Sequence, residues 1–406
     1  MVTVLRNRDF LALWLSQLIS RIGDNFAVVA SLVLINELAT RTGLAVVVLA
    51  AAATIPQLFA LASGVFIDRF SRKAVMIVSD LLRSLVILLP LLVQDSSQLY
   101  ILYLSAFLLM GLSALYVPAR NASIPNMVPE EDLMTANALI QATDLVSLIG
   151  GATLATLVIS LFSVSTAWVV DSLTFVVSAL FLVAARIPQG KQPTMSSAAG
   201  GELRHFWAEF VDGVRYIFRN KPLLQLMAIT TMATLGLTAT VLLAAAYFQQ
   251  LLGISAQYVG LLQATQGLGM ALGAVLISVY ASWARSRQIV SATMIMLGCG
   301  ILVYAVAPVY WLVLAGALIV GLCVVSARTT LAAMTQALVP DSQRGRVESA
   351  MVTVIGLGTM GALIIAGILG DVVGPESVFI FTGVVVLLAG IASIFALREA
   401  EERLLN

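Results

Sequence analysis

The chain carries little charge, almost no histidine and few cysteines. Of its 406 residues only 11% are charged, whereas a soluble domain has about a quarter. The net charge of +1 at pH 7 gives no basic surface for nucleic acid. Cys299 and Cys323 both lie in apolar runs, a pattern that favours buried thiols over a disulfide or a metal site.

Missing motifs narrow the function further. The one histidine, His205, falls in a polar segment. It can therefore neither complete a catalytic triad inside an apolar span nor carry protons through such a span. The sequence has no Gly-x-x-x-x-Gly-Lys-Ser/Thr loop for ATP. No cluster of cysteine, histidine and carboxylate residues suggests a metal. We therefore expect neither an enzyme nor an ATP-driven pump, with no cofactor and no metal.

Long apolar runs are abundant. Hydrophobic residues make up 60% of the chain, and a helix needs about 20 mostly apolar residues to cross a bilayer. The predicted spans are 10–38, 43–67, 74–94, 98–118, 136–163, 165–186, 222–252, 256–284, 288–308, 310–338, 346–374 and 376–398. The chain is thus expected to be an all-α membrane protein with twelve transmembrane helices in the lipid bilayer.

Lys and Arg are unevenly distributed between the connecting loops. They lie before span 1, in every second loop and after span 12, with Arg120 placed just after span 4, while the opposite loops hold only Arg41. Because Lys and Arg favour the cytoplasmic side, both termini and the long middle segment are predicted to be cytoplasmic. The expected location is the inner cell membrane, crossed many times.

The middle segment, 187–221, differs in composition from its flanks. Gly, Pro, Ser and Gln dominate 187–201, which is typical of a linker. Apolar residues then recur at helical spacing across 202–220, which predicts an amphipathic helix on the cytoplasmic membrane face. We interpret the segment as a tether between two halves; a regulatory or partner-binding site is the alternative.

Three pairs of segments, one from each half, indicate an internal duplication. The pairs are 7–13 with 220–226, Gly64 with Gly273, and 128–130 with 339–341. Their offsets of 213, 209 and 211 residues are nearly one value. The predicted organisation is an N-terminal half, 1–186, a cytoplasmic linker, 187–221, and a C-terminal half, 222–406. Two pseudo-symmetric six-helix halves are typical of transporters that rock about a substrate site near the bilayer midplane.

The loop between spans 2 and 3 reads GVFIDRFSRK at 64–73. It resembles the signature Gly-x-x-x-Asp-Arg-x-x-Arg-Lys loop of the major facilitator superfamily, and the resemblance implies the major facilitator fold. In that family the loop latches the cytoplasmic side in the outward-open state. The resemblance therefore implies a gating role for Gly64, Asp68, Arg69, Arg72 and Lys73. A positive-inside loop with a chance acid is the alternative.

Further segments resemble the macrolide-efflux-like branch of drug:proton antiporters. They are FLALWLSQ at 10–17, SRIGD at 20–24, PARNA at 118–122, ANAL at 136–139 and RGRV at 344–347. The resemblance implies proton-coupled efflux of amphipathic small molecules, drug-like or macrolide-like, by alternating access, and we expect a monomer. The branch also holds siderophore exporters and lysophospholipid flippases, which are the alternative functions.

Two features of the family are reduced in this sequence. The arginine that relatives often carry in span 4 is absent from the predicted span. The Gly-Pro-x-x-Gly-Gly signature of span 5 is shortened to GGATLA at 150–155. Efflux is therefore implied by the branch resemblance more than by these two motifs.

Ionisable residues inside the predicted spans are functional candidates because a charge in a bilayer is costly. Arg21 and Asp24 lie near the middle of span 1, three residues apart and so on one helix face. Asp144 lies in span 5 and Asp171 in span 6. We predict that Asp24 carries the coupled proton, with Arg21, Asp144 and Asp171 as further candidates. A static Arg21–Asp24 pair, and structural roles for the other two acids, are the alternatives.

Two further sets of polar residues lie in the spans. Asp80 and Arg83 of span 3 lie near the 64–73 loop, which favours a gating network with that loop. The candidates for lining a substrate cavity are Asn25, Gln141, Tyr247, Gln263 and Gln266. Ordinary interhelical hydrogen bonds explain each of these five as well. The glycines expected to permit close helix contact are Gly267, Gly269, Gly273, Gly356, Gly358 and Gly361.

Overall fold

The protein is helical throughout the part that the structure describes. The computed structural model describes residues 2–58, 70–188, 211–252, 258–280, 285–307, 309–340 and 343–405, and these contain no strand. Within these ranges ten helices are long and apolar enough to cross a membrane, and Gly43–Pro56 is a shorter apolar helix. The prediction of a multi-span all-α membrane protein is confirmed.

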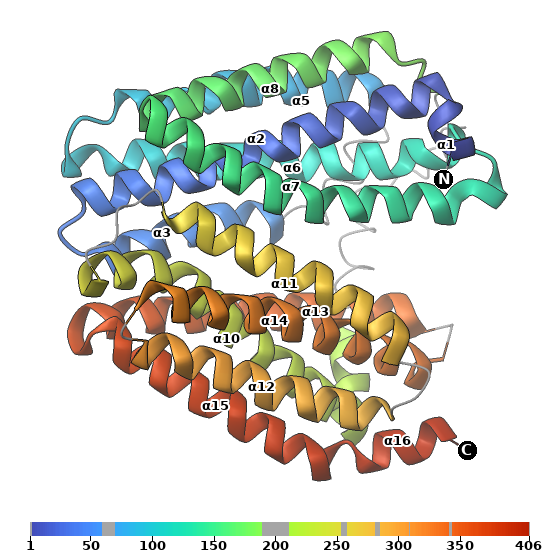
Figure 1. The fold of residues 1–406 in the computed structure, drawn as a ribbon. Coiled ribbons are helices and arrows are strands. Elements are labelled where there is room, and N and C mark those ends of the chain that lie inside the picture. The colour runs from blue at the N-terminus through green and yellow to red at the C-terminus, as the bar shows by residue number, and fades with distance from the viewer. Residues whose placement is uncertain are drawn as a thin grey trace. The chain divides into compact units, whose positions relative to one another are not determined.

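The helices of the first half follow the predicted spans closely. After the short α1 (Val2–Arg6), the long helices are α2 (Arg8–Leu38), α3 (Thr42–Leu58), α5 (Arg72–Val86), α6 (Leu99–Ser123), α7 (Leu133–Leu161) and α8 (Val164–Ala184). The end of predicted span 2, after residue 58, lies outside the described residues. In Figure 1, α2, α5, α6, α7 and α8 run alongside one another, and α2 packs against both α7 and α8.

The second half repeats this arrangement of long helices. They are α10 (Lys221–Leu252), α11 (Tyr258–Tyr280), α12 (Ser286–Val306), α13 (Tyr310–Leu338), α14 (Arg344–Val373) and α15 (Pro375–Ala396), followed by the short α16 (Arg398–Leu405). Helix α12 packs against α13 and α15, and α10 packs against α14 and α15. Twelve described helices thus match the twelve predicted spans.

The chain separates into two compact units. One comprises Met1–Thr40, Val48–Ala199 and Ala256–Ala264, and the other Arg41–Val47, Gly200–Ser255 and Thr265–Asn406. Helices α3 and α11 are therefore each divided between the units. The boundaries of 1–186, 187–221 and 222–406 stay a prediction.

Polar side chains fix where several helices begin. The Asn7 side chain accepts hydrogen bonds from the backbone N–H groups of Asp9 and Phe10, and its amide donates to the Met127 carbonyl at 2.7 Å. Ser71 and Ser163 cap α5 and α8 in the same way. Such caps satisfy N–H groups that have no partner within the helix. Asn7 in addition ties the start of α2 to the link between α6 and α7.

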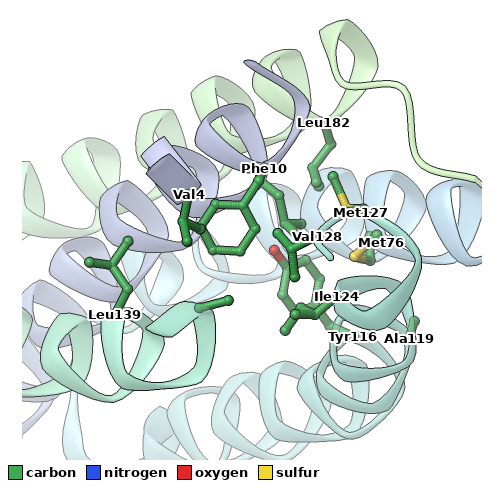
Figure 2. Packing of buried hydrophobic residues seen from close by; sticks show 12 residues of the cluster. Val4, Phe10, Met76, Tyr116, Ala119, Ile124, Met127, Val128, Leu139 and Leu182 are labelled. Atoms are coloured by element: carbon green, nitrogen blue, oxygen red, sulfur yellow. The ribbon is translucent and has the colours of Figure 1, made fainter. Parts of the chain in front are cut away.

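An apolar cluster closes one end of the first half (Figure 2). We call it the end cluster; its buried members are Val4, Phe10, Leu13, Met76, Tyr116, Ala119, Ile124, Met127, Val128, Ala136, Leu139 and Leu182. They come from α1, α2, α5, α6, α7 and α8 and from the link between α6 and α7. Burying this surface draws six helices together at the end where α2 and α5 begin.

The internal duplication has structural counterparts. Val128 and Val339, from the matching Val-Pro-acid segments, are both buried. Lys73 at the start of α5 donates to the carbonyls of Val183 and Ala185 at the end of α8, both at 2.7 Å. Arg287, 214 residues later at the start of α12, donates to the Ile394 carbonyl of α15 at 2.8 Å. Each half therefore uses a basic residue on its third span to hold the end of its sixth.

Glycines allow close approach in α11 but not throughout α14. A Cβ added at Gly269 or Gly273 would meet the backbone of α13, so the expectation of close contact is confirmed there. A Cβ at Gly356 or Gly361 would meet nothing within 4 Å. The same expectation is wrong for these two residues, because a glycine run need not face a neighbouring helix. Cys323 is buried as expected, but Cys299 is exposed, so that expectation is wrong for Cys299.

The described part of the middle segment is helical at 211–219. Ile217 is fully buried there, and a Cβ at Gly213 would meet the Arg346 carbonyl at the start of α14. This end of the predicted amphipathic helix therefore packs on protein as well as presenting exposed apolar residues such as Phe218. Residues 189–210 of the predicted linker and helix lie outside the described residues.

Candidate functional site

Three charged side chains meet midway along α2 and α7. Arg21 Nη1 lies 3.5 Å from Asp24 Oδ2, and Arg21 Nε lies 3.4 Å from Asp144 Oδ1. The two carboxylates thus share one guanidinium through different nitrogens. The i,i+3 spacing in the sequence predicted the first contact, but nothing local could predict the second, because Asp144 is 123 residues from Arg21.

The exposure of this trio indicates that it faces water. The side chains of Arg21, Asp24 and Asp144 are 39%, 29% and 54% exposed. Charged groups inside a span avoid lipid and face a water-filled space or the bundle interior. Since two of the three are acids, the trio carries one net negative charge when both carboxylates are ionised.

Close packing of α7 on α2 positions the trio. The Asn25 amide donates to the carbonyl of Arg21 at 2.8 Å and to that of Ser147 at 3.0 Å. A Cβ at Gly151 would lie 2.9 Å from the Asn25 amide nitrogen and from the Ile22 carbonyl, so only glycine fits there without a shift. The amide of Asn25 is therefore used in an interhelical clamp. Its role in a substrate cavity stays a prediction.

Asp171 of α8 faces Gly23 of α2, the residue before Asp24, and is fully buried. Thr174 Oγ1 donates to Asp171 Oδ1 at 3.2 Å, while Asp171 Oδ2 has no hydrogen-bond partner among the described residues. Asp171 lies within electrostatic range of Asp24 on α2. A Cβ at Gly23 would collide with Asp171 Oδ1 and Thr174 Oγ1, so Gly23 provides the room that the carboxylate occupies.

Asp80 and Arg83 form a second, buried group on α5. Arg83 Nη2 lies 2.5 Å from Asp80 Oδ1, and Ser178 of α8 donates to Asp80 Oδ2 at 2.6 Å. The Arg83 guanidinium stacks over the rings of Tyr116 and Phe175, at 4.4 and 4.8 Å from their centroids. The sequence predicted the pair, but it gave no signal for Ser178, Tyr116 or Phe175 because they lie on other helices.

Arg120 was missed because span 4 is longer than predicted. The prediction placed Arg120 after span 4, but α6 continues through Pro118 to Ser123 and buries Arg120. Its guanidinium donates to Asn121 Oδ1 at 2.8 and 3.1 Å and lies within electrostatic range of Arg21 and Asp144. The expectation that span 4 lacks an arginine is therefore wrong. The helical spacing of Tyr116, Arg120 and Ser123, at i, i+4 and i+7, is the sequence signal that could have corrected it, and all three are buried in the structure.

The basic end of the 64–73 loop caps helices of the first half. Arg72 Nη1 donates to the Ala122 carbonyl at the end of α6 at 2.6 Å, and Lys73 holds the end of α8. A cation at a helix C-terminus also interacts favourably with the helix dipole. Gly64, Asp68 and Arg69 of the predicted gating motif lie outside the described residues.

The remaining cavity candidates are not gathered around the trio by any described contact. Gln263 is buried and Gln266 is half-buried in α11. The backbones of Gln141 and Tyr247 lie in α7 and α10, and their side chains are outside the described part of the structure. Their role in substrate binding stays a prediction.

Within the described parts of the spans, buried charge is confined to the first half. Among the described residues of the spans, the buried ionisable acids and bases are Asp80, Arg83, Arg120 and Asp171, and all four belong to the first half. Because α2, α5, α6 and α8 pack together, these groups and the trio form one electrostatically connected set.

Comparison with known proteins agrees with this architecture. The profile of the MFS_3 family, described as "Transmembrane secretion effector", matches residues 2–405. Macrolide efflux protein A of Streptococcus pyogenes is 23% identical over 389 residues, covering 93% of each chain. The multidrug efflux pump Tap of Mycolicibacterium fortuitum is 28% identical over 370 residues, covering 87% of each chain.

Solved structures share the fold at lower identity. The nucleoside transporter NupG has a TM-score of 0.75 at 12% identity, covering 96% of this chain and 99% of its own. A bacterial homologue of the iron transporter ferroportin has a TM-score of 0.73 at 17% identity, covering 98% and 99%. With a family profile spanning nearly all of the sequence and twelve helices in the expected places, the chain belongs to the transmembrane secretion effector family, MFS_3, of the major facilitator superfamily.

Proposed function

We propose that the protein exports amphipathic small molecules in exchange for protons, by alternating access. The observation that carries the proposal is the trio, in which Asp24 and Asp144 share Arg21 on an exposed surface midway along two spans. Relatives of the chain are a macrolide efflux protein and a multidrug efflux pump, which supports drug-like or macrolide-like substrates. As a transporter in the inner membrane, it would move its substrate without chemical change.

The charge balance of the trio suits an antiporter. Two carboxylates and one guanidinium leave one negative charge that a proton can neutralise, and so can a cationic group on a substrate. When a proton neutralises the trio, binding of a cationic substrate is disfavoured, because a second positive charge would lack a counter-ion. A bound cationic substrate disfavours binding of a proton for the same reason. Competition of this kind makes proton uptake and substrate release alternate.

Asp24 is the residue that we propose to load and release the proton. It contacts Arg21 in the trio and lies within electrostatic range of the buried Asp171. Ionisation of one carboxylate opposes ionisation of the other, so a change in the spacing of α2 and α8 would change proton affinity. Arg21, Asp144 and Asp171 complete this proposed coupling site.

The remaining residues have proposed supporting roles. The 64–73 loop, with Asp80 and Arg83, would gate the end of the first half where α5 begins. The side chains proposed to contact substrate are Asn25, Gln141, Tyr247, Gln263 and Gln266. Both termini would lie in the cytoplasm, and the monomer would contain one complete transport path.

Sealed everted vesicles with an imposed pH gradient test the proposal. A labelled macrolide and a fluorescent lipophilic cation serve as probes. We expect accumulation that collapses when an ionophore dissipates the gradient. Asp24→Asn should abolish gradient-driven uptake, Asp24→Glu should retain part of it, and Asp95→Asn, in the exposed link between α5 and α6, should retain all of it.

Two outcomes would contradict the proposal. Full gradient-driven uptake by Asp24→Asn would remove Asp24 from the coupling site. Transport that persists after the gradient collapses would exclude proton coupling, and movement of a labelled lysophospholipid under the same conditions would then favour a flippase.

A further inference from the structure

Arg83 is buried in the first half with one of its donors unused. Its side chain is 5% exposed, and its Nη2 pairs with Asp80. Its Nε has no hydrogen-bond partner among the described residues. A buried N–H without a partner is costly, so an unused donor on a charged group needs an explanation.

Asp80 alone does not explain how Arg83 is placed. Both oxygens of Asp80 already have partners, Oδ1 with Arg83 and Oδ2 with Ser178. The stacking of the guanidinium over Tyr116 and Phe175 supports its plane without using its N–H groups. The stacking therefore does not determine which carboxylate the N–H groups pair with.

The matching acceptor lies one helical turn away on α8. Phe175 follows Asp171 by four residues, about 6 Å along the helix axis, and on the same face. Asp171 is fully buried, its Oδ2 has no partner, and Arg83 lies within its electrostatic range. An unused donor on a buried cation thus lies near an unused acceptor on a buried acid.

The other charged groups around Asp171 cannot serve as its counter-ion. Asp24, the ionisable group of α2 within range of Asp171, is itself an acid, and Arg21 is already shared by Asp24 and Asp144. Helix α5 contributes Asp80 and Arg83. Helix α6 contributes the neutral Tyr116 and also Arg120, which donates to Asn121 and has Asp144 as the acid within its electrostatic range. Arg83 is the cation that remains for an ionised Asp171.

We propose that Arg83 is a counter-ion shared by Asp80 and Asp171, paired with Asp80 in the state described and turned toward Asp171 when Asp171 is ionised. This rests on the proposed proton coupling and assigns a positioning residue to it. The change of partner would loosen the contact of Asp80 with Ser178 between α5 and α8. Because α5 begins at Arg72, ionisation of Asp171 would reach Arg72 and Lys73, which hold the ends of α6 and α8, through one helix.

A double-mutant cycle in thermal stability of the purified full-length protein tests the sharing. Asp80→Asn leaves Arg83 with Asp171, and Asp171→Asn leaves it with Asp80, so each change should lower the melting temperature only slightly. Together they leave a buried guanidinium with no carboxylate, and the fall should exceed the sum of the two. The control pair is Asp80→Asn with Asp144→Asn, which should be additive because Asp144 contacts Arg21 instead.

Additive effects of Asp80→Asn and Asp171→Asn would overturn the proposal. So would a single Asp80→Asn variant that unfolds as readily as the double variant, because Arg83 would then have no second partner.

A charge-neutral variant, Asp80→Asn with Arg83→Gln, separates positioning from stability. It removes both charges of the pair and should fold, yet it leaves Asp171 without a cation. We expect the melting temperature to stay close to that of the unmodified protein while gradient-driven uptake is lost. Full gradient-driven uptake by this variant would overturn the proposal. If the unmodified protein transports without a proton gradient, the proposed function fails, and the melting cycle still decides whether Arg83 is shared.

Discussion

Gly23, which has no side chain, allows the buried Asp171 to lie close to α2 and the trio. Gly23 sits one residue before Asp24, and its bare backbone faces Asp171 and Thr174 of α8. Any side chain there would push α8 away or turn the Asp171 carboxylate out of its place. The distance between two acids on neighbouring helices therefore depends on a residue that carries no functional group.

Replacing Gly23 with alanine should damage both stability and transport. Overpacking of a close helix contact costs about 1–3 kcal/mol, so the melting temperature in detergent should fall and gradient-driven uptake should drop with it. Gly150→Ala is the matched control, because its new Cβ would meet nothing within 4 Å. Alanine favours helix over glycine, so Gly150→Ala should be neutral or stabilising.

Adding Thr174→Ala to Gly23→Ala removes one of the two collisions. We expect part of the lost melting temperature to return. An unchanged melting temperature in Gly23→Ala itself would show that the two helices are not in close contact at this point.

Arg21 should not be replaceable by lysine. Its guanidinium contacts Asp24 and Asp144 through two nitrogens, whereas an ammonium group is a compact charge without that fork. We expect Arg21→Lys to fold normally and to lose most gradient-driven uptake, measured in sealed vesicles. Arg215→Lys is the control, since Arg215 pairs with one acid, Asp212, and both side chains are exposed. Equal uptake by both variants would argue against a shared arginine.

Helix α5 connects the interior of the first half to the basic end of the 64–73 loop, the proposed gate. Its first turn carries Arg72 and Lys73, which hold the ends of α6 and α8, and its middle carries Asp80 and Arg83. Met76, which lies between these two levels in the sequence of α5, belongs to the end cluster (Figure 2). A shift of α5 along its axis would disturb all three levels together.

Removing the Lys73 ammonium should loosen the end of α8. Lys73→Met keeps the apolar stem but loses two hydrogen bonds to carbonyls, worth about 1.5–3 kcal/mol each for a charged donor. We expect a lower melting temperature and faster hydrogen exchange at the end of α8, measured by mass spectrometry. The counterpart Arg287→Met should act on the end of α15 instead. Faster exchange at α15 in the Lys73 variant would contradict this assignment.

At the scale of the molecule, the two halves share their arrangement of helices but differ in the residues packed between those helices. Both have six long helices and a basic residue that holds the last helix. In the second half, Gly298 and Gly390 bring the backbones of α12 and α15 into close contact, where the first half places Asp80, Arg83 and Ser178 between α5 and α8. In the proposed mechanism, the first half is therefore the one that responds to protonation.

The predicted orientation can be tested with single cysteines. In a background with Cys299→Ser and Cys323→Ser, Ser97→Cys should react with a membrane-impermeant maleimide on intact cells. Glu402→Cys should react only after the membrane is permeabilised, because the C-terminus is predicted to be cytoplasmic. Ser97 and Glu402 are both exposed, so access to the reagent is not limited by burial. Labelling of Glu402→Cys on intact cells would reverse the orientation.

The sequence could predict what depends on local pattern. Span lengths and apolar content located all twelve long helices, and the 64–73 loop resembled the right superfamily. Contacts between helices had no such signal. Asp144 joins Arg21, and Ser178 joins Asp80, only because distant segments pack together. Arg120 was misplaced because predicted span 4 ended at residue 118, whereas α6 continues through Pro118 to Ser123.

If the trio is the coupling site that we propose, its charge determines how the membrane voltage acts on transport. Arg21, Asp24 and Asp144 together need one positive charge for neutrality. If one proton and one monovalent cationic substrate alternate at the trio, a full cycle moves no net charge across the membrane, and the membrane voltage does not drive transport. A neutral substrate exchanged for one proton moves one charge through the field, worth about 2.3 kcal/mol per 100 mV. The same site would thus be voltage-insensitive for a cationic drug and voltage-driven for an uncharged one.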